Sequence, residues 1–354
     1  MNEQYATPTL RQVLTQQKLP VPCRASAAAS RNTIGWTWPD LEVAVWDEFN
    51  LANLNESYGH ILALEVQRPY PRADQLLQGL ATNSAADVKE LIGWNDGLLR
   101  PVLERAKSHL GLYPGTVLHH VHSTADQSVI AKLRNVRQRL TVDHIIGLDD
   151  FPIQNLVVGL GRPSRKWSGG TLANQIQSGS VTGELLWPVR QLANICDKAG
   201  TRYGYIQTDE ELVVFCYSKR GAGWKAAFMP IPWSRHGAEV LTSDLALWWL
   251  CMLAMSPSHH RAVTNEEDMV KINDWDLVYQ DHLGGWVRRH RYSNFEEPAD
   301  PPPPPTYETP SPGNQAAFEA GVGLHANKWF DIGNSFDLDY NCMLTHPEAD
   351  LGPH

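Results

Sequence analysis

The stretch LVVGLGRPSRKWSGG, residues 156–170, runs from an apolar segment directly into a cluster of cationic and aromatic side chains. The apolar segment is typical of a strand that is covered on both faces of a sheet. Arg162, Arg165, Lys166 and Trp167 follow it at once. Gly-x-Pro-Ser is typical of turns, and loops after buried strands often carry binding sites in α/β folds. The stretch therefore predicts an interior strand with a candidate site at its end.

Sequence patterns on both sides of this strand predict a mixed sheet with helices. Three β-branched stretches read as strands, TVLHHVHS (116–123), RLTVDHIIGL (139–148) and IQNLVVGL (153–160). Apolar residues at helical spacing predict helices over 85–109, with a break or kink at Pro101, over 186–199, with Pro188 in the first turn, and over the buried stretch 241–256. A hairpin over 202–218 turns at QTDEE, WKAAFMPIPW gives another strand, and helix-like stretches such as EVAVWDEFNLANL fall within 41–83. The predicted fold class is α/β (α+β), a mixed central sheet with helical N-terminal and C-terminal additions.

Composition limits the classes of function. The chain has 354 residues, of which 42% are hydrophobic and 19% charged, so it is long and apolar enough for a substantial core. A formal net charge of −9 makes nucleic acid an unlikely partner, because such affinity comes from clustered Lys and Arg. Five scattered cysteines without zinc spacing favour reduced thiols and an intracellular, cytoplasmic protein. The longest apolar stretch, 245–255, is too short to span a bilayer, which predicts no membrane association.

The chain divides into four predicted regions. Residues 1–40 form an N-terminal arm, 41–299 a single α/β domain, 300–313 a Pro-rich linker and 314–354 a C-terminal tail. The linker lies within the stretch ADPPPPPTYETPSPG (299–313), whose composition is typical of polyproline II. Such a segment serves either as a spacer or as a ligand for an SH3-like partner. No pattern in the sequence sets an oligomeric state.

The order helix, three strands, helix, strand is that of the αβββαβ core of restriction-endonuclease-like, or PD-(D/E)xK, proteins. The stretches VDHIIGLDD, LVVGLGRPSRKW, LWPVRQLANICDKAGTRYGYIQTDEELVVF and MPIPWSRHGAEVLTSDLALWWLCMLAMS resemble a group of filamentous-fungal proteins with that core. The resemblance implies a metal site in which an Asp on one strand and an Asp/Glu-x-Lys on the next hold Mg²⁺. It places the first carboxylate at Asp143, the supporting helix Gln at Gln191 and an upstream acid at Glu104 or Glu90.

The resemblance breaks at the second carboxylate. The Asp/Glu-x-Lys positions fall on Leu160, Gly161 and Arg162. Leucine cannot bind a metal, and arginine stays protonated at ordinary pH and cannot act as a base. The metal motif is therefore degenerate, and we predict neither a metal nor another cofactor. The histidines of HHVH, residues 119–122, do not alter this, because no third ligand accompanies them.

These residues predict a pocket at the strand end. Arg162, Lys166, Asp143 and Gln191 are the predicted catalytic residues, which act by positioning and hydrogen bonding. The predicted substrate-binding residues are Trp167, Arg190, Trp187, Tyr205, Trp233 and His236. Alternatives remain open: Arg162 pairs with Asp143 as a structural bridge, GRPSRKW is a surface turn, and Trp187 and Tyr205 pack in the core.

Three functions are compatible with these patterns. The thirteen tryptophans and the Arg/Lys/Trp cluster favour a nuclease-like fold repurposed as a metal-independent enzyme of fungal specialised metabolism. Its reaction would be of the cyclase, isomerase or pericyclase type, on a hydrophobic small molecule. The first alternative is a Mg²⁺-dependent PD-(D/E)xK nuclease, and the second is a catalytically dead binding or scaffold protein.

Overall fold

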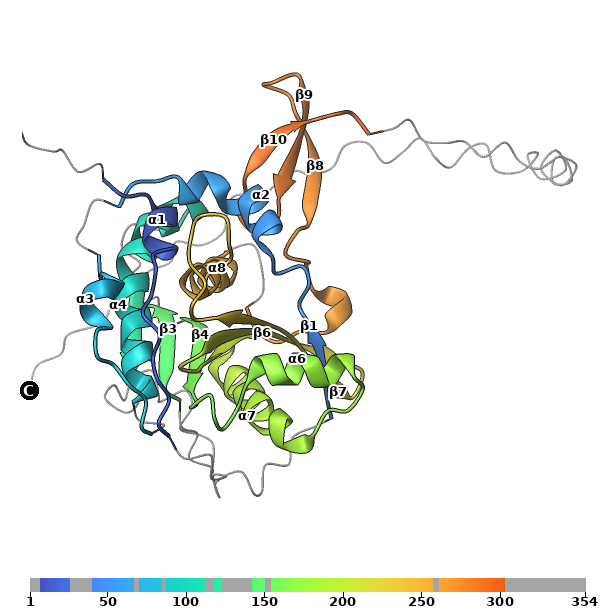
Figure 1. Ribbon diagram of the computed structural model, residues 1–354. Coiled ribbons are helices and arrows are strands. Elements are labelled where there is room, and N and C mark those ends of the chain that lie inside the picture. Colours follow the sequence, from blue (N-terminus) through green and yellow to red (C-terminus); the bar gives the residue numbers. More distant parts are fainter. Residues whose placement is uncertain are drawn as a thin grey trace, which may run out of the picture. The chain divides into compact units, whose positions relative to one another are not determined.

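A seven-stranded mixed sheet forms the middle layer of the computed structural model (Figure 1), with the strand order β1-β7-β6-β5-β4-β3-β2. The strands are β1 Leu41–Val45, β2 Leu118–His122, β3 His144–Leu148, β4 Gln154–Gly161, β5 Tyr203–Gln207, β6 Glu211–Arg220 and β7 Gly223–Pro232. β4 runs parallel to β5 and β1 parallel to β7, and the other neighbours are antiparallel. The predicted α/β class with a mixed central sheet is confirmed.

The structure describes residues 7–25, 40–66, 70–84, 87–112, 118–122, 142–149, 154–256 and 261–302. All of these except Pro302 belong to one compact unit, Met1–Pro301. The predicted tail, 314–354, and the linker beyond residue 302 lie outside the described residues.

Helices cover both faces of the sheet. One face carries α4 Val88–Lys107 and α8 Ser243–Met255, and the other carries α6 Gly169–Gln177 and α7 Gly183–Ala199 (Figure 1). All thirteen residues of α8 are buried, because it lies between the sheet, α4 and the N-terminal helices. An apolar surface on every side of a helix requires this position. Two apolar cores result, one on each side of the sheet.

Strand β4 lies inside the sheet, as predicted, between β3 and β5. Packing explains the two glycines of this strand. A Cβ on Gly159 would lie 2.4 Å from the ring of Tyr205, and one on Gly161 would lie 3.1 Å from Val88 of α4. The glycines therefore let the tyrosine ring and the start of α4 pack directly on the strand.

The N-terminal region differs from its prediction. Residues 41–45 are not helical but form β1, whose alternating Leu and Val residues pair with β7. Asn50 then caps the helix α2 Leu51–Leu62 by accepting from Asn53 N. Within the predicted arm, residues 7–25 contain α1 Leu10–Leu14, whose apolar side chains are buried against α8. A short helix, α3 Ala73–Leu76, precedes α4.

Other differences concern helix ends and the C-terminal part. α4 continues through Pro101, and α7 begins at Gly183, so that Pro188 lies beyond the first turn. Within the described ranges, the 3₁₀ segments are η2 Ser108–Leu110 and η3 Glu266–Asp268. A second, antiparallel sheet was not predicted and consists of β8 Trp275–Gln280, β9 Gly285–His290 and β10 Glu296–Ala299. Among the described residues, no helix has the length and apolar character needed to cross a membrane.

Candidate functional site

Three of the predicted catalytic residues lie together at the carboxyl end of β4. We call Asp143, Arg162 and Gln191 the strand-end cluster. Arg162 Nη2 donates to Gln191 Oε1 over 2.6 Å, and Arg162 Nη1 lies 3.9 Å from Asp143 Oδ2. The same Asp143 oxygen accepts from Gly161 N over 2.9 Å. The cluster therefore joins the start of β3, the end of β4 and the middle of α7.

Neighbouring groups also contact the cluster. Arg162 Nη1 donates to Gly161 O over 2.6 Å, and Lys89 Nζ lies 3.7 Å from Asp143 Oδ1. Burial lowers the pKa of Arg162 and the charge of Asp143 opposes this, yet an arginine remains protonated at neutral pH. These contacts favour the alternative in which Arg162 and Asp143 form a structural bridge.

The loop after β4 is held by carboxylates from a distant turn. Asp209 accepts from Ser164 N and Oγ over 2.9 and 2.6 Å, and Glu211 accepts from Gly169 N over 2.6 Å. Burial raises the pKa of Glu211, against the effect of these backbone hydrogen bonds. Acidic side chains from the β5–β6 turn and the first residue of β6 thus order a loop that has no carboxylate of its own.

The other predicted residues do not join the cluster. Lys166 is exposed, and the described residues include no ion pair to it. Trp167, its neighbour, is buried in the core beside α6 and α7, and its Nε1 donates to Leu185 O over 2.9 Å. The ring of Trp167 is thus enclosed by protein, which favours a packing role over the predicted contact with a ligand.

The remaining predicted substrate-binding residues are dispersed. Trp187 is 37% exposed on α7 and Arg190 is half-buried on the same helix. Tyr205 lies in the core on the α4 side, with its hydroxyl 2.5 Å from His144 Nδ1. Trp233 is buried, and its Nε1 donates to Leu19 O over 3.0 Å, whereas His236 is exposed. The predicted rim of Trp233 and His236 is not formed, because the tryptophan turns into the core.

The position of the missing carboxylate is apolar. Leu160 is wholly buried among apolar side chains on the α7 side of the sheet. In the part of the chain that the structure describes, no three His, Cys, Asp or Glu residues form a group that could hold a metal ion. The side chains of β2, which include the HHVH histidines, lie outside the described residues.

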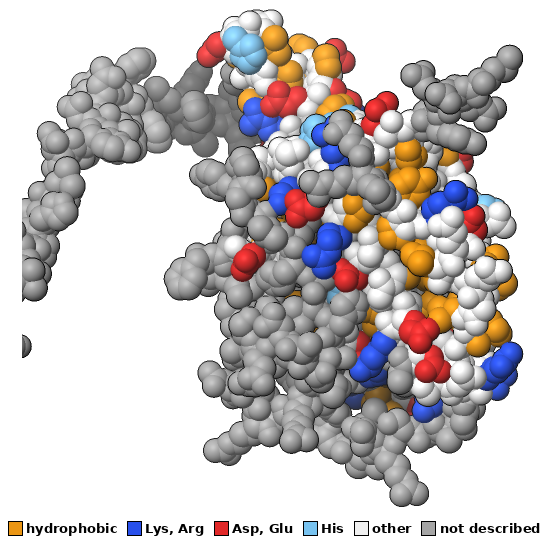
Figure 2. Space-filling model, turned by 90° about the vertical axis from the view of Figure 1, so that its left-hand side faces the viewer, with side chains coloured by type: hydrophobic (Ala, Val, Ile, Leu, Met, Phe, Trp, Pro, Cys, Tyr) orange, Lys and Arg blue, Asp and Glu red, His pale blue; other side chains and the backbone are white. Residues whose placement is uncertain are grey.

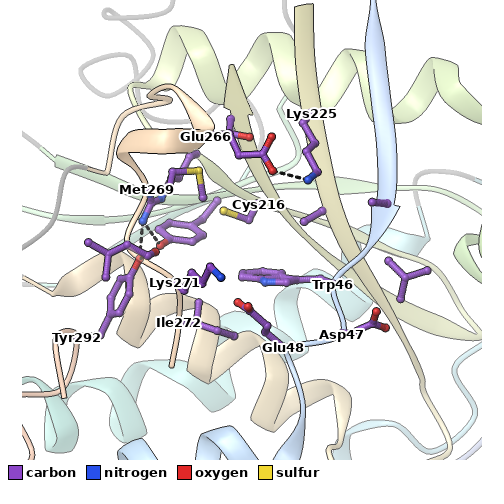
Figure 3. A pocket seen from close by; sticks show the side chains of 17 residues that line it. Trp46, Asp47, Glu48, Cys216, Lys225, Glu266, Met269, Lys271, Ile272 and Tyr292 are labelled. Atoms are coloured by element: carbon purple, nitrogen blue, oxygen red, sulfur yellow. Dashed lines mark hydrogen bonds and ion pairs between the residues drawn. The ribbon is translucent and has the colours of Figure 1, made fainter. Parts of the chain in front are cut away.

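A pocket of about 410 Å³ lies elsewhere, on the face of the sheet that carries α8. A row of residues crosses the sheet beneath it, Ala44 on β1, Ala227 on β7, Cys216 on β6 and Tyr203 on β5. Three of these four side chains are small, so they leave space that a larger residue would fill. The segment that contains Met269, Val270 and Ile272 forms the opposite wall (Figure 3).

Buried polar groups lie at one end of this pocket. Arg202, Tyr203 and Tyr292 line it, and Arg202 Nη2 donates to the two tyrosine hydroxyls over 2.9 and 2.6 Å. Tyr292 in turn donates to Val270 O over 2.9 Å. Figure 3 shows Tyr292 on one side of the pocket and Trp46 on the other. The pocket thus combines a few fixed polar groups with apolar walls, the usual composition of small-molecule sites.

Charged side chains surround the mouth of the pocket. Lys225 is paired with Glu266, and both side chains are partly buried (Figure 3). Asp47, Glu48 and Lys271 are exposed. Sequence reasoning missed this pocket because six separate segments, from residue 44 to residue 292, build it. The only local indication was the pair of small residues at alternate positions of β6, Cys216 and Ser218.

No protein-family model, curated protein or solved structure matches this chain.

Proposed function

We propose that this chain is a metal-independent enzyme that binds a hydrophobic small molecule in the pocket over β6 and β7. One observation carries the proposal: the pocket has an apolar wall and buried hydrogen-bonding groups at one end. Its volume of about 410 Å³ lies within the range of ligand pockets in proteins, roughly 300–1,000 Å³.

The proposed reaction is of the cyclase, isomerase or pericyclase type. Such a reaction rearranges bonds within one molecule, so it needs no oxidant, reductant or second substrate. The protein would hold the substrate in a reactive conformation and stabilise charge on one of its oxygens. Arg202 and Tyr203 are the candidates for that second role, because they lie beside each other on the pocket wall.

The scaffold proposed for this enzyme is the restriction-endonuclease-like core. The succession α4, β2, β3, β4, α7, β5 supports it, since these strands are neighbours in one sheet and β4 runs parallel to β5. The same succession favours a second candidate function, a Mg²⁺-dependent nuclease with Asp143 as metal ligand. Leu160 opposes it, and so does the formal net charge of −9. On the face drawn in Figure 2, acidic and basic side chains of the described residues are interspersed.

A ligand-retention experiment tests the proposed function. The protein is incubated with the metabolite extract of the organism that produces it, washed and denatured, and released compounds are measured by mass spectrometry. We expect a retained compound, and a product of the same mass when it is incubated again with enzyme. Ala227→Leu should abolish retention because its side chain fills the pocket, whereas the exposed turn variant Ala222→Leu should not.

Two outcomes would contradict the proposal. One is equal retention by the wild type and Ala227→Leu, which would place the ligand elsewhere. The other is Mg²⁺-dependent cleavage of plasmid DNA that Asp143→Ala abolishes, which would establish the nuclease.

A further inference from the structure

Arg202 is a buried cation without a carboxylate partner in the described part of the chain. The residue is only 3% exposed, and its hydrogen bonds to side chains run from Nη2 to the hydroxyls of Tyr203 and Tyr292. Its Nε is buried and makes no hydrogen bond. Buried charges are normally paired, because removing a charge from water is costly.

The neighbours of Arg202 cannot supply the missing negative charge. Burial raises the pKa of Tyr203 and Tyr292, so both phenols stay protonated at neutral pH. Burial also raises the pKa of the Cys216 thiol, to about 11. The guanidinium therefore lies among uncharged groups.

Another buried cation of the same protein shows the usual arrangement. Lys18 Nζ lies 2.8 Å from Asp244 Oδ1, with both side chains almost wholly buried. The contrast indicates that the partner of Arg202 is not one of the described side chains, and Arg202 lines the pocket.

We propose that Arg202 binds the carboxylate of a monocarboxylic acid whose apolar body fills the rest of the pocket. This inference rests on the proposed function, since it requires a small molecule in that pocket. One buried cation balances one negative charge, and an arginine guanidinium matches a carboxylate in geometry. Tyr203 lies beside the same guanidinium and would contact the acid group.

The rest of the lining sets the orientation and the class of acid. Ala44, Ala227, Met269 and Ile272 offer an apolar surface for the body of the ligand. Asp47 and Glu48 lie exposed at the mouth and would repel a second acidic group. Lys225 is already paired with Glu266. The pocket therefore selects a monocarboxylate over a dicarboxylate or a phosphate ester.

Calorimetric titration with a matched pair of probes tests the inference. The probes are 2-naphthoate and 2-naphthamide, which share a shape and differ in charge. We expect the wild type to bind the acid about tenfold more tightly, as the loss of one charged hydrogen bond implies. Arg202→Gln should abolish this preference while the amide still binds. Lys271→Gln, which removes the exposed cation of the pocket, should keep the preference.

Each outcome has a distinct meaning. Equal affinity of the wild type for both probes would overturn the carboxylate anchor and leave the proposed function standing. Binding of neither probe would overturn both. Should Arg202→Gln fail to fold, Arg202→Lys tests the same contact, because lysine keeps the charge but lacks the planar fork of the guanidinium. An unchanged preference for the acid in that folded variant would overturn the guanidinium contact.

Discussion

Replacing Lys18 by methionine should destabilise the protein by about 3–5 kcal/mol, because it leaves a carboxylate buried without its cation. The Lys18 and Asp244 side chains are 0% and 2% exposed, and their charged atoms are 2.8 Å apart. Lys18 also donates to Ser243 and lies over the ring of Trp233, 3.7 Å from its centroid. Methionine has nearly the same length, so the change removes charge and hydrogen bonds while most of the volume is kept.

The cost arises from what remains. Without Lys18, Asp244 keeps one side-chain partner among the described residues, Trp94 Nε1 at 3.3 Å, and its Oδ2 has no hydrogen bond. Burial lowers the pKa of Lys18, although Asp244 acts in the opposite direction, so the charged pair is not itself a strong source of stability. A Lys18→Met/Asp244→Leu double variant should therefore recover most of the loss, because neither charge is then buried.

Urea unfolding provides the measurement. We expect a lower midpoint with an unchanged slope, from which the free energy of unfolding follows. Arg72→Met is the matched control: it breaks the Arg72–Asp74 pair, whose side chains are 57% and 59% exposed, and should cost less than about 1 kcal/mol. The reasoning fails if Lys18→Met costs no more than this control, or if the double variant is as unstable as the single one.

Three further predictions concern pH, packing and metal. The folded-state pKa of Lys18 lies below 10.5, its value in the unfolded chain, so at pH values between these two pKa values the folded state binds fewer protons than the unfolded state. The free energy of unfolding of the wild type should therefore rise with pH across that window more than that of Lys18→Met. Unfolding at several pH values measures this difference. Gly159→Ala should lower the free energy of unfolding by about 1–3 kcal/mol, because its Cβ would meet the Tyr205 ring at 2.4 Å. Gly59→Ala, on α2 with open space around it, should raise the same quantity by about 0.5–1 kcal/mol, and equal effects of the two variants would refute the packing argument. EDTA should leave ligand retention unchanged, since Leu160 offers no oxygen to a metal; retention that EDTA abolishes and Mg²⁺ restores would show the opposite.

The strands and helices were predictable where a local pattern has one structural meaning. The β-branched runs became β3 and β4, and the turn QTDEE separates β5 from β6. The apolar run LALWWLCMLAM lies within the buried α8. In contrast, β1 was missed because its five residues run within a few positions into a helix, and only its pairing with β7 makes it a strand.

The candidate site was less predictable because sequence neighbours diverge in space. Lys166 is exposed and Trp167 is buried, although they are adjacent and were assigned to one pocket. A sequence pattern can indicate that a residue follows a strand, but it does not show which element covers that residue. The convergence of Asp143, Arg162 and Gln191 could be predicted, because it depends only on the order of β3, β4 and α7. The pocket could not, because it requires contacts across six segments.

The position of β1 at the border of the sheet gives the pocket a mechanical property. This strand pairs with β7 alone, and Ala44, Val45 and Trp46 supply one side of the pocket. If the segment 41–45 detaches, that side is lost while the other six strands keep their pairing. A molecule in the pocket therefore ties the edge strand to the sheet, and the amide hydrogens of residues 41–45 should exchange with solvent more slowly when it is bound. Ligand binding in the pocket and pairing of β1 with β7 are therefore thermodynamically coupled.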